Sequence, residues 1–298
     1  MRVFVTGATG FIGSAIVQEL INAGHQVVGL ARSDAAADAL TKLGIEVHRG
    51  ALDDLDSLKR SAAASDGVIH TAFIHDFSDY AANGETDRRA VEALGAALVG
   101  SGRPLVITSG ITVLPSGRLG SEDEEADPNS ISAPRVASEK VVLSLASQGV
   151  RASVVRLPPS VHGDGDRGFV PALIAIAREK GVSVYVGDGL NRWPAVHRLD
   201  AAHLFRLAFE KGSAGARFHG VADEGVPVKQ IAEVIGRRLN VPIVAKSPEG
   251  AADHFGWLGH FLSVDCPASS VLTQERLGWI PKQPALIADL DRADYFET

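Results

Sequence analysis

The sequence predicts an α/β fold built on a doubly wound parallel sheet. A β-branched and aromatic run at residues 2–6 enters a turn that holds Gly7, Gly10 and Gly13. An apolar stripe at helical spacing follows directly, from Ile12 to Ile21. Strand-like and helix-like segments then alternate along the chain, which is the pattern of parallel β-α-β units.

The glycine turn suits the binding of a dinucleotide. Gly7 can turn sharply because it has no Cβ, Gly10 lets the backbone approach a pyrophosphate, and Gly13 lets the helix pack tightly on the strand. Free N–H groups at the start of the helix then face the anion. An ordinary tight strand-to-helix turn is the alternative, but the strand, the helix and the terminal position together favour nucleotide binding.

The spacing of this turn is Thr-Gly-x-x-Gly-x-x-Gly over residues 6–13. It resembles the short-chain dehydrogenase/reductase superfamily, and most of all its extended branch. With the departures described below, the chain resembles the atypical extended group, whose members are often called NAD-dependent epimerases or dehydratases. The resemblance implies a Rossmann-like doubly wound parallel sheet with a smaller C-terminal substrate domain. Residues 1–160 would bind NAD(P), with the sheet completed by segments within 183–220, and residues 161–298 would mainly bind substrate.

The composition describes a globular protein with a substantial core. The chain has 298 residues, of which 45% are hydrophobic and 22% charged, so one large or two modest domains are expected. The net charge of −7 argues against a nucleic-acid partner. A single cysteine, Cys266, excludes an internal disulfide framework and fits a reducing compartment. Since neither a signal region nor a membrane-spanning run is seen, we expect a cytoplasmic protein.

The second predicted strand, residues 26–31, ends at Arg32 and Ser33. In a doubly wound nucleotide fold, an acidic residue at this point holds the adenosine ribose hydroxyls, whereas an arginine accommodates a 2′-phosphate. Arg32 therefore favours NADP over NAD. The alternative is a solvated surface arginine.

The third strand is expected at residues 45–50, after a helix at 35–43. Relatives usually continue with Gly-Asp and an apolar residue, and that aspartate binds adenine. Here Leu52 precedes Asp53, so the aspartate is displaced. Asp53 is a candidate adenine contact, or else Asp53 or Asp54 starts the next helix.

Residues 66–73 resemble the family's fourth strand, whose end lines the cofactor. An irregular polar segment at 74–84 follows, and in open α/β sheets ligands bind in such loops after the strands. The next expected elements are a helix at 85–99, a strand at 104–110, a helix at 134–147 and a strand at 152–157.

Two later stretches extend the resemblance. Residues 158–163 resemble the end of the family's Arg-x-Pro-x-Val-Tyr-Gly segment, which passes the nicotinamide, with His162 in place of the tyrosine. The last third resembles the signature Gly-x-Gly-x-x-Arg followed by Val-His-Val-x-Asp. Its arginine, here Arg192, serves a substrate pocket in the family, and its aspartate, Asp200, is expected to cap the helix at 200–210.

The family's catalytic pair is absent. That pair is a tyrosine followed four residues later by a lysine, which together supply positioned acid–base catalysis. This chain has three tyrosines, and none has a lysine four positions on. In the corresponding helix, Arg135 and Glu139 occupy the two positions in one alignment, and Val136 and Lys140 in the other. Arg135 stays protonated near pH 7 and suits an oxyanion or carboxylate clamp, while an ordinary helix ion pair with Glu139 is an equal alternative.

Another proton-transfer group must replace the tyrosine. The family's serine position is also altered, because Gly110 stands at the strict site with Ser109 beside it. Asp87 falls where the family often has an asparagine. The candidate acids near the expected nicotinamide are His75, Tyr80, Asp87, Glu139 and His162.

These observations predict an NADP-dependent oxidoreductase or epimerase-like enzyme that acts on a carbonyl or alcohol group of a small molecule. The alternative is a redox-inactive NADP-binding sensor or regulatory protein. The missing tyrosine and lysine favour the sensor, whereas the retained pocket signature favours the enzyme. No nucleic-acid, membrane or metal partner is expected, and pairing into a homodimer is common in the family.

The residues predicted for each role can be stated together. The cofactor contacts are Gly7, Thr9, Gly10, Phe11, Ile12, Gly13, Arg32, Ser33, Leu52, Thr71, Ala72, Phe73, Pro158 and Ser160. The catalytic candidates are Asp87, Ser109, Arg135, Glu139 and His162. The substrate pocket is formed by His75, Phe77, Tyr80, Arg192 and Trp193.

Overall fold

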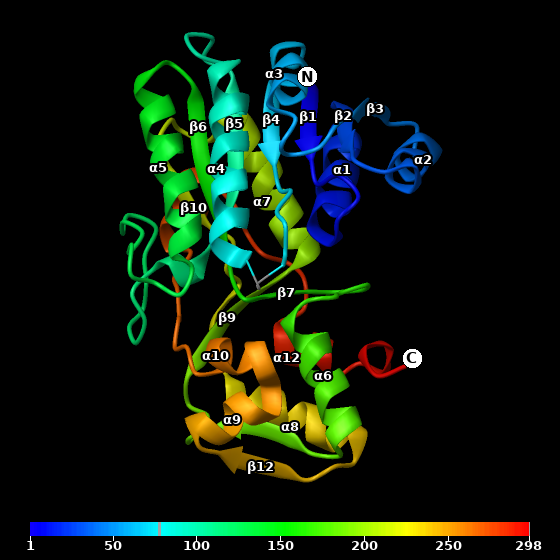
Figure 1. Cartoon of the computed structure of the whole chain (residues 1–298), viewed down its shortest axis with the longest axis vertical. Helices are drawn as coiled ribbons and strands as arrows, with labels where there is room; N and C mark the ends of the chain where they lie inside the picture. The colour runs from blue at the N-terminus through cyan, green and yellow to red at the C-terminus, as the bar shows by residue number, and fades with distance from the viewer. Residues whose placement is uncertain (77–78, 298) are drawn as a thin grey trace.

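Seven parallel strands form the main sheet of the protein in a computed structural model that describes residues 1–76 and 79–297 (Figure 1). The strands are β1 (Arg2–Thr6), β2 (Gln26–Ala31), β3 (Glu46–Arg49), β4 (Gly67–His70), β5 (Pro104–Gly110), β6 (Arg151–Leu157) and β10 (Arg217–His219). Their order is β10-β6-β5-β4-β1-β2-β3, and each neighbouring pair is parallel. The predicted α/β fold with a doubly wound parallel sheet is therefore confirmed.

Helices cover both faces of this sheet (Figure 1). On one face lie α1 (Phe11–Asn22), α2 (Asp34–Lys42) and α7 (Arg198–Lys211), and on the other lie α3 (Leu55–Ala63), α4 (Tyr80–Ala96) and α5 (Ala133–Ser147). The apolar stripe of α1 is buried, as its helical spacing predicts. Each face encloses its own apolar core, so the sheet edge that carries the strand ends is held rigidly.

The later part of the chain forms a second layer of structure below the carboxyl ends of the main strands (Figure 1). Its strands are β7 (Ser160–His162), β9 (Arg192–His197) and β11 (Asp223–Pro227) in one sheet, and β8 (Ser183–Val186) and β12 (Ile243–Lys246) in another. Its helices are α6 (Phe169–Lys180), α8 (Val228–Leu239), α9 (Pro248–Phe255), α10 (Gly259–Leu262) and α12 (Leu286–Leu290). Helix α11 (Val271–Leu277) packs against α7 and β10, and the single-turn 3-10 helices are 111–113, 256–258 and 293–295.

Helix α4 begins earlier than the sequence predicts. The expected start was residue 85, but the helix starts at Tyr80 because the Asp79 side chain accepts a hydrogen bond from the Ala82 N–H at 3.4 Å. The irregular segment expected at 74–84 is shorter as a result, and Tyr80 lies on the first turn of a helix.

The expected cap of α7 is wrong. The helix begins at Arg198, and His197 caps it by accepting a hydrogen bond from the Leu199 N–H at Nδ1, 3.2 Å away. Asp200 instead accepts hydrogen bonds from the backbone N–H groups of Lys282 and Gln283, at 3.0 and 2.9 Å. Its carboxylate therefore fixes a late segment of the chain to α7.

The start of α3 shows which of Asp53 and Asp54 caps the helix. Asp54 is its cap and accepts a hydrogen bond from the Ser57 N–H at 3.0 Å. Asp53 is exposed beside it.

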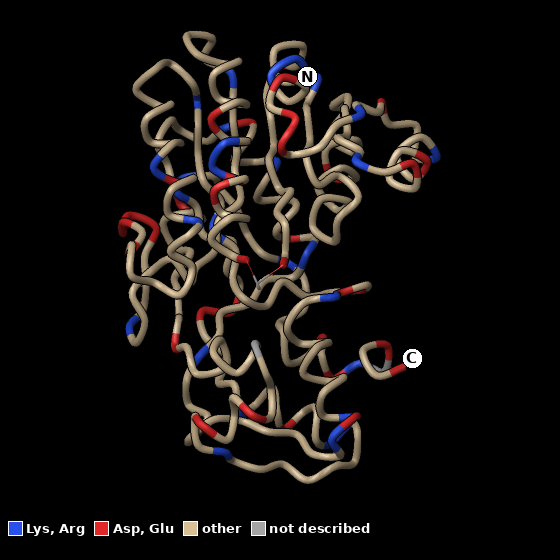
Figure 2. The backbone as a smooth tube through the Cα atoms, viewed as in Figure 1, with Lys and Arg blue, Asp and Glu red and all other residues tan. Residues whose placement is uncertain are grey.

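Charged residues of both signs are interspersed over the whole protein (Figure 2). This distribution agrees with the net charge of −7. Within the described residues, no helix combines the length and apolar character needed to cross a bilayer.

Candidate functional site

The glycine turn between β1 and α1 has the close backbone contacts that its sequence predicts. Gly7 has a φ of +71°, and a Cβ there would lie 2.8 Å from the Ala72 backbone nitrogen. A Cβ on Gly13 would lie 1.9 Å from the Gly7 carbonyl oxygen. Neither position can accept a side chain without moving the backbone.

The start of α1 is open to an anion. Gly10 caps the helix without a side-chain hydrogen bond, and the first turn, which includes Phe11 and Ile12, has no acidic residue. The first N–H groups of a helix have no partner within it, and the helix dipole adds positive potential there. This end of α1 therefore fits the diphosphate of a dinucleotide.

The end of β4 is fastened beside this turn. The Thr71 hydroxyl donates to the Thr6 carbonyl at 2.8 Å, and the Ala72 N–H lies 3.3 Å from the Thr6 hydroxyl oxygen that accepts its hydrogen bond. The carboxyl end of β4 is thereby held against Gly7, where the predicted cofactor contacts Thr71, Ala72 and Phe73 follow one another.

The end of β2 presents a cationic side chain. Arg32 is exposed, and within the described residues it forms no ion pair. The Ser33 hydroxyl caps α2 by accepting a hydrogen bond from the Ala36 N–H at 3.2 Å. The next residue, Asp34, pairs with Arg49, so its carboxylate is already compensated.

A buried network links β1, β4, α4 and α5. Thr6 Oγ1 lies 2.8 Å from His70 Nδ1, and His70 Nε2 lies 3.1 Å from Asp87 Oδ1. The Ser138 hydroxyl donates to Asp87 Oδ2 at 2.6 Å. Burial alone would raise the pKa of Asp87, but the charge of Arg135 and hydrogen bonds from His70 and Ser138 lower it overall. Asp87 is therefore an ionised residue at neutral pH.

Arg135 lies where the ends of β4 and β5 meet. Its guanidinium is 4.1 Å from the centre of the Phe73 ring, donates to the Thr108 carbonyl, and has Nη1 3.5 Å from Asp87 Oδ1. Nη1 is buried and has no hydrogen-bond partner in the described structure. A cationic donor with an unused N–H at the carboxyl edge of a parallel sheet is suited to an oxygen of a ligand.

Two further candidate residues, His75 and Tyr80, contact the Phe73 ring that also packs against Arg135. His75 and Tyr80 each make an edge contact with the Phe73 ring, with ring centres 5.3 and 5.9 Å away. Desolvation and the charge of Arg135 lower the pKa of His75 below its usual 6.5, against an opposing backbone hydrogen bond at Phe73. The lowered pKa favours the neutral imidazole at pH 7, although the residue is exposed to solvent.

Hydroxyl groups lie near the ends of β5 and the start of α5. Ser109 Oγ is buried without a hydrogen-bond partner. Thr112 and Ser132 hydroxyls lie 2.7 Å apart, on either side of the segment that joins β5 to α5. The sequence reasoning missed Thr112 and Ser132, although their positions just after a strand and just before a helix were visible.

Glu139 takes a different partner from the one expected. Its carboxylate accepts two hydrogen bonds from the buried Arg156, from Nε at 3.0 Å and Nη2 at 2.7 Å. Since Arg135 pairs with Asp87 instead, the alternative of an Arg135–Glu139 helix ion pair is wrong. Asp87 and Glu139 are thus each paired with an arginine. Of these two ion pairs, the one between Asp87 and Arg135 adjoins Phe73.

His162 is fully buried in the second layer. Its Nδ1 lies 2.8 Å from Asp289 Oδ2, and its ring packs edge-on against His197 with centres 5.4 Å apart. Its Nε2 has no hydrogen-bond partner in the described structure. On the same sheet Ser160 is buried with an unpartnered hydroxyl, and Pro158 before it is also buried.

The remaining substrate candidates lie on β9. Arg192 binds Asp265 through Nε and Nη2 at 3.0 and 2.9 Å, and Trp193 is buried against Phe169. No hydrogen bond, ion pair or ring contact of the described residues joins either one to Arg135. Phe77 lies outside the described residues.

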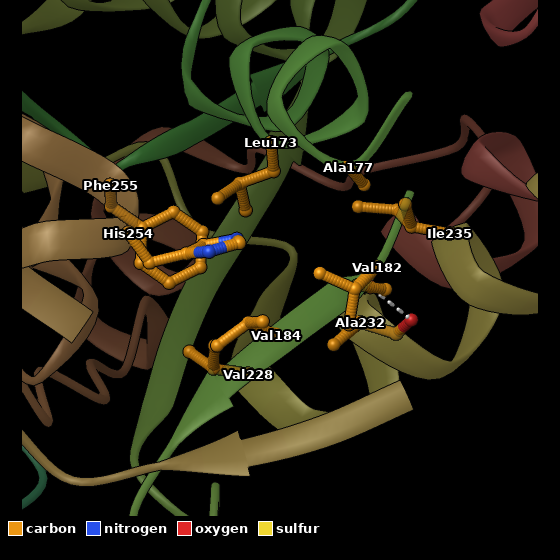
Figure 3. Close-up of a pocket in the computed structure, with 10 residues that line it drawn as sticks. Leu173, Ala177, Val182, Val184, Val228, Ala232, Ile235, His254 and Phe255 are labelled. Carbon is orange, nitrogen blue, oxygen red and sulfur yellow. Dashed lines mark hydrogen bonds between the residues drawn. The ribbon is translucent and has the colours of Figure 1, made fainter. Parts of the chain in front are cut away.

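An enclosed cavity lies elsewhere, between α6, α8, β8 and α9 (Figure 3). Its volume is about 10 Å³, and it is lined mainly by apolar side chains such as Leu173, Val184 and Val228. A cavity of this size holds at most about one water molecule. It is too small for a nucleotide or a metabolite. A larger, more open hollow of about 320 Å³ lies between α1, α7 and residues 280–283, away from Arg135. The carboxyl ends of the main strands are the candidate site because of the glycine turn and the Arg135 contacts, not because of a cavity.

Comparisons with known proteins agree with this geometry. The sequence matches the family model described as the NAD dependent epimerase/dehydratase family over residues 3–220. It is 55% identical over 297 residues to an uncharacterized protein of Schizosaccharomyces pombe, covering 99% of this chain and 100% of that protein. It is 29% identical over 263 residues to a 2-alkyl-3-oxoalkanoate reductase of Stenotrophomonas maltophilia, covering 83% and 78% of the two chains.

The fold is also found among solved structures. A dTDP-glucose 4,6-dehydratase from Streptomyces venezuelae, crystallised as a double mutant with NAD bound, superimposes with a TM-score of 0.80. The two chains are 20% identical, and the match covers 99% of this chain and 97% of the other. The similarity extends over both layers of the protein.

Proposed function

The chain belongs to the NAD-dependent epimerase/dehydratase family, of the extended short-chain dehydrogenase/reductase type, and on this premise we propose that it is an NADP-dependent oxidoreductase of small-molecule carbonyl or alcohol groups. The single observation that carries the proposal is Arg135. Its guanidinium lies over Phe73 at the carboxyl ends of the strands that adjoin the glycine turn, and its buried Nη1 makes no hydrogen bond and is 3.5 Å from its ion-pair partner, Asp87 Oδ1.

The residues present fit a dinucleotide. Without side chains at Gly7 and Gly13, the backbone can form the close turn, and the open start of α1 holds the diphosphate. Arg32, exposed at the end of β2, binds the 2′-phosphate that distinguishes NADP from NAD. Ala72 and Phe73 would hold the nicotinamide, which would supply or accept a hydride at the substrate carbon.

In this proposal, Arg135 provides the electrostatic stabilisation of the substrate oxygen that the tyrosine and lysine pair is expected to provide in relatives. During reduction, negative charge develops on the substrate oxygen, and a fixed guanidinium donor stabilises that charge most at the transition state. Arg135 cannot itself give up a proton near pH 7. It binds and orients the oxygen, and a second group must move the proton.

The buried network around Asp87 positions Arg135. Asp87 is held by His70 and Ser138 on one side and attracts the guanidinium on the other. Because all three partners are buried, the guanidinium is restricted to one place above Phe73. We assign His70, Asp87 and Ser138 to positioning rather than to proton transfer.

His75 or Tyr80 transfers the proton to or from the substrate oxygen. Of the five candidate acids, Asp87 is ionised, Glu139 is bound to Arg156, and His162 is bound to Asp289. His75 and Tyr80 are the two that flank Phe73 beside Arg135. His75 is favoured because an imidazole is the side chain whose ordinary pKa lies closest to neutral pH, and desolvation and the charge of Arg135 lower the pKa of this one.

The substrate is a ketone or the corresponding alcohol. A 2-alkyl-3-oxoalkanoate reductase among the relatives acts on such a group, and a cationic donor without a strong acid suits carbonyl polarisation. Arg192 is bound to Asp265 and Trp193 is buried, so this proposal assigns the substrate contacts to Arg135, His75 and Tyr80 instead. A cytoplasmic homodimer completes it, and the buried free thiol of Cys266 is consistent with a reducing compartment.

A substrate screen tests the proposal. The protein is supplied with NADPH or NADH and with panels of aldehydes, ketones and nucleotide sugars, and the loss of reduced nicotinamide is followed. We expect turnover with at least one ketone panel and a higher kcat/KM with NADPH than with NADH. Tight NADPH binding without turnover in any panel would instead support the redox-inactive sensor.

A further inference from the structure

Arg198, the first residue of α7, lies against the first turn of α1. Its guanidinium carbon is 4.8 Å from the centre of the Phe11 ring, and its Nη2 is 3.5 Å from the Ser14 hydroxyl. Phe11 opens α1 directly after the glycine turn. A side chain from the later part of the chain therefore adjoins the end of α1 that faces the diphosphate in the proposed function.

The positive charge of Arg198 is not neutralised by the protein. Nη1 donates to the Asp164 carbonyl at 2.7 Å, which supplies a partner but no negative charge. The Asp164 carboxylate is held by Arg292 at 2.7 Å instead. Within residues 1–76 and 79–297, no carboxylate pairs with Arg198, and its Nε is buried without a hydrogen-bond partner.

The surroundings of Arg198 favour an anion. The start of a helix carries partial positive charge, so a guanidinium beside the start of α1 is repelled unless a negative group compensates both. The first turn of α1 supplies no acidic side chain and Gly10 supplies no side-chain cap. A diphosphate at the helix start would satisfy the free N–H groups and the guanidinium together.

The loop after β7 fixes Arg198 in this place. Gly163 has a φ of +127°, and a Cβ there would lie 3.1 Å from Arg198 Cγ, so a larger residue would displace the side chain. The Gly163 N–H donates to the Tyr295 hydroxyl oxygen at 2.9 Å, which anchors the loop to the C-terminal segment. The guanidinium is thus preorganised rather than free to swing away.

We propose that Arg198 binds the diphosphate of the dinucleotide and so clamps the later part of the chain onto α1. This inference rests on the proposed function. It gives Arg198 a role distinct from that of Arg32, because the diphosphate is common to NADH and NADPH, whereas the 2′-phosphate is present only in NADPH. The two arginines therefore make separable contributions to affinity.

The experiment is an equilibrium titration of NADPH and NADH, read by quenching of protein fluorescence without any substrate. Arg198→Met keeps the apolar stem over Phe11 and removes the charge, Arg198→Lys keeps the charge, and Arg32→Met is the comparator. Arg237→Met is the matched control, because Arg237 is exposed and pairs with Asp291 on the surface. Circular dichroism and the thermal midpoint check that each variant is folded.

We expect Arg198→Met to weaken NADPH and NADH by the same factor, at least about tenfold, with partial recovery in Arg198→Lys. Arg32→Met should weaken NADPH alone, and Arg237→Met should change neither. Unchanged affinities in folded Arg198→Met would overturn the assignment, as would a loss confined to NADPH. A wild-type protein that binds neither dinucleotide would overturn the proposed function as well, so the two failures can be told apart.

Discussion

At the scale of single residues, the proposed function assigns the stabilisation of charge to Arg135 and the pH dependence to His75. Arg135 is held by Phe73, Thr108 and Asp87, and its charge contributes to lowering the pKa of His75. A guanidinium and a neutral imidazole side by side are therefore expected at pH 7. In the proposed function, Arg135 stabilises charge on the substrate oxygen and His75 exchanges the proton.

The first prediction concerns the pH profile. In carbonyl reduction the proton donor is the protonated imidazole, so kcat should fall as the pH rises through the lowered pKa of His75, below 6.5. In the reverse oxidation, kcat should rise over the same range. His75→Gln should remove this inflection and lower kcat by roughly 10²-fold, while Tyr80→Phe should leave the inflection in place. An inflection that persists in His75→Gln would assign the proton to another group.

At the scale of elements, α5 organises the site through two ion pairs on two of its sides. Arg135 pairs with Asp87 of α4, whereas Glu139, one turn later, pairs with Arg156 of β6. The first ion pair adjoins Phe73. The second is fully buried and joins α5 to strand β6 of the main sheet. Glu139 thereby fixes the helix that presents Arg135.

The second prediction is a stability change at this tie. Glu139→Gln leaves the buried Arg156 without its counter-charge, which costs about 3–5 kcal/mol in comparable buried pairs. The urea midpoint should fall accordingly, while Glu275→Gln, at an exposed position on α11, should stay within about 0.5 kcal/mol of wild type. Equal midpoints for the two variants would show that Glu139 does not fix α5.

The glycine turn could be predicted from the sequence because its determinants are local. Gly7 and Gly13 are required by contacts within the turn itself and with the end of β4, and β1 and α1 flank it directly. The starts of α4 and α7 are harder to predict, because Asp79 and His197 cap these helices several residues before the starts that the sequence pattern indicates. The start of a helix depends on which side chain accepts a hydrogen bond from its free N–H groups.

The partners of the site residues could not be predicted. The hydrogen bond from Ser138 to Asp87 joins residues 51 positions apart, and nothing near Arg135 in the sequence indicates that Asp87 rather than Glu139 is its partner. The contacts of His70, Thr112 and Ser132 depend on how the fold places β4, α4, β5 and α5 beside one another, although the positions of Thr112 and Ser132 after a strand and before a helix are readable in the sequence. Contacts between residues at the carboxyl ends of neighbouring strands are determined by the tertiary fold and not by local sequence.

At the scale of the whole molecule, late segments of the chain return to the site built by early ones. Asp200 fixes residues 282–283 to α7, His162 binds Asp289, and Tyr295 holds the loop at Gly163. Arg198 then joins this later part to the start of α1. The two layers are thus connected at the end of the sheet where the cofactor and substrate are proposed to meet.

The most direct test of the account is the transfer of deuterium from NADPH labelled at nicotinamide C4 to the product of the best substrate. Wild-type protein should transfer the label. Arg135→Met should lower kcat/KM by about 10²–10³-fold while its affinity for NADPH stays unchanged. Arg89→Met, which removes an exposed arginine from α4, should behave as wild type. Label transfer by Arg135→Met at the wild-type rate, or no transfer by wild type to any carbonyl substrate, would contradict the account.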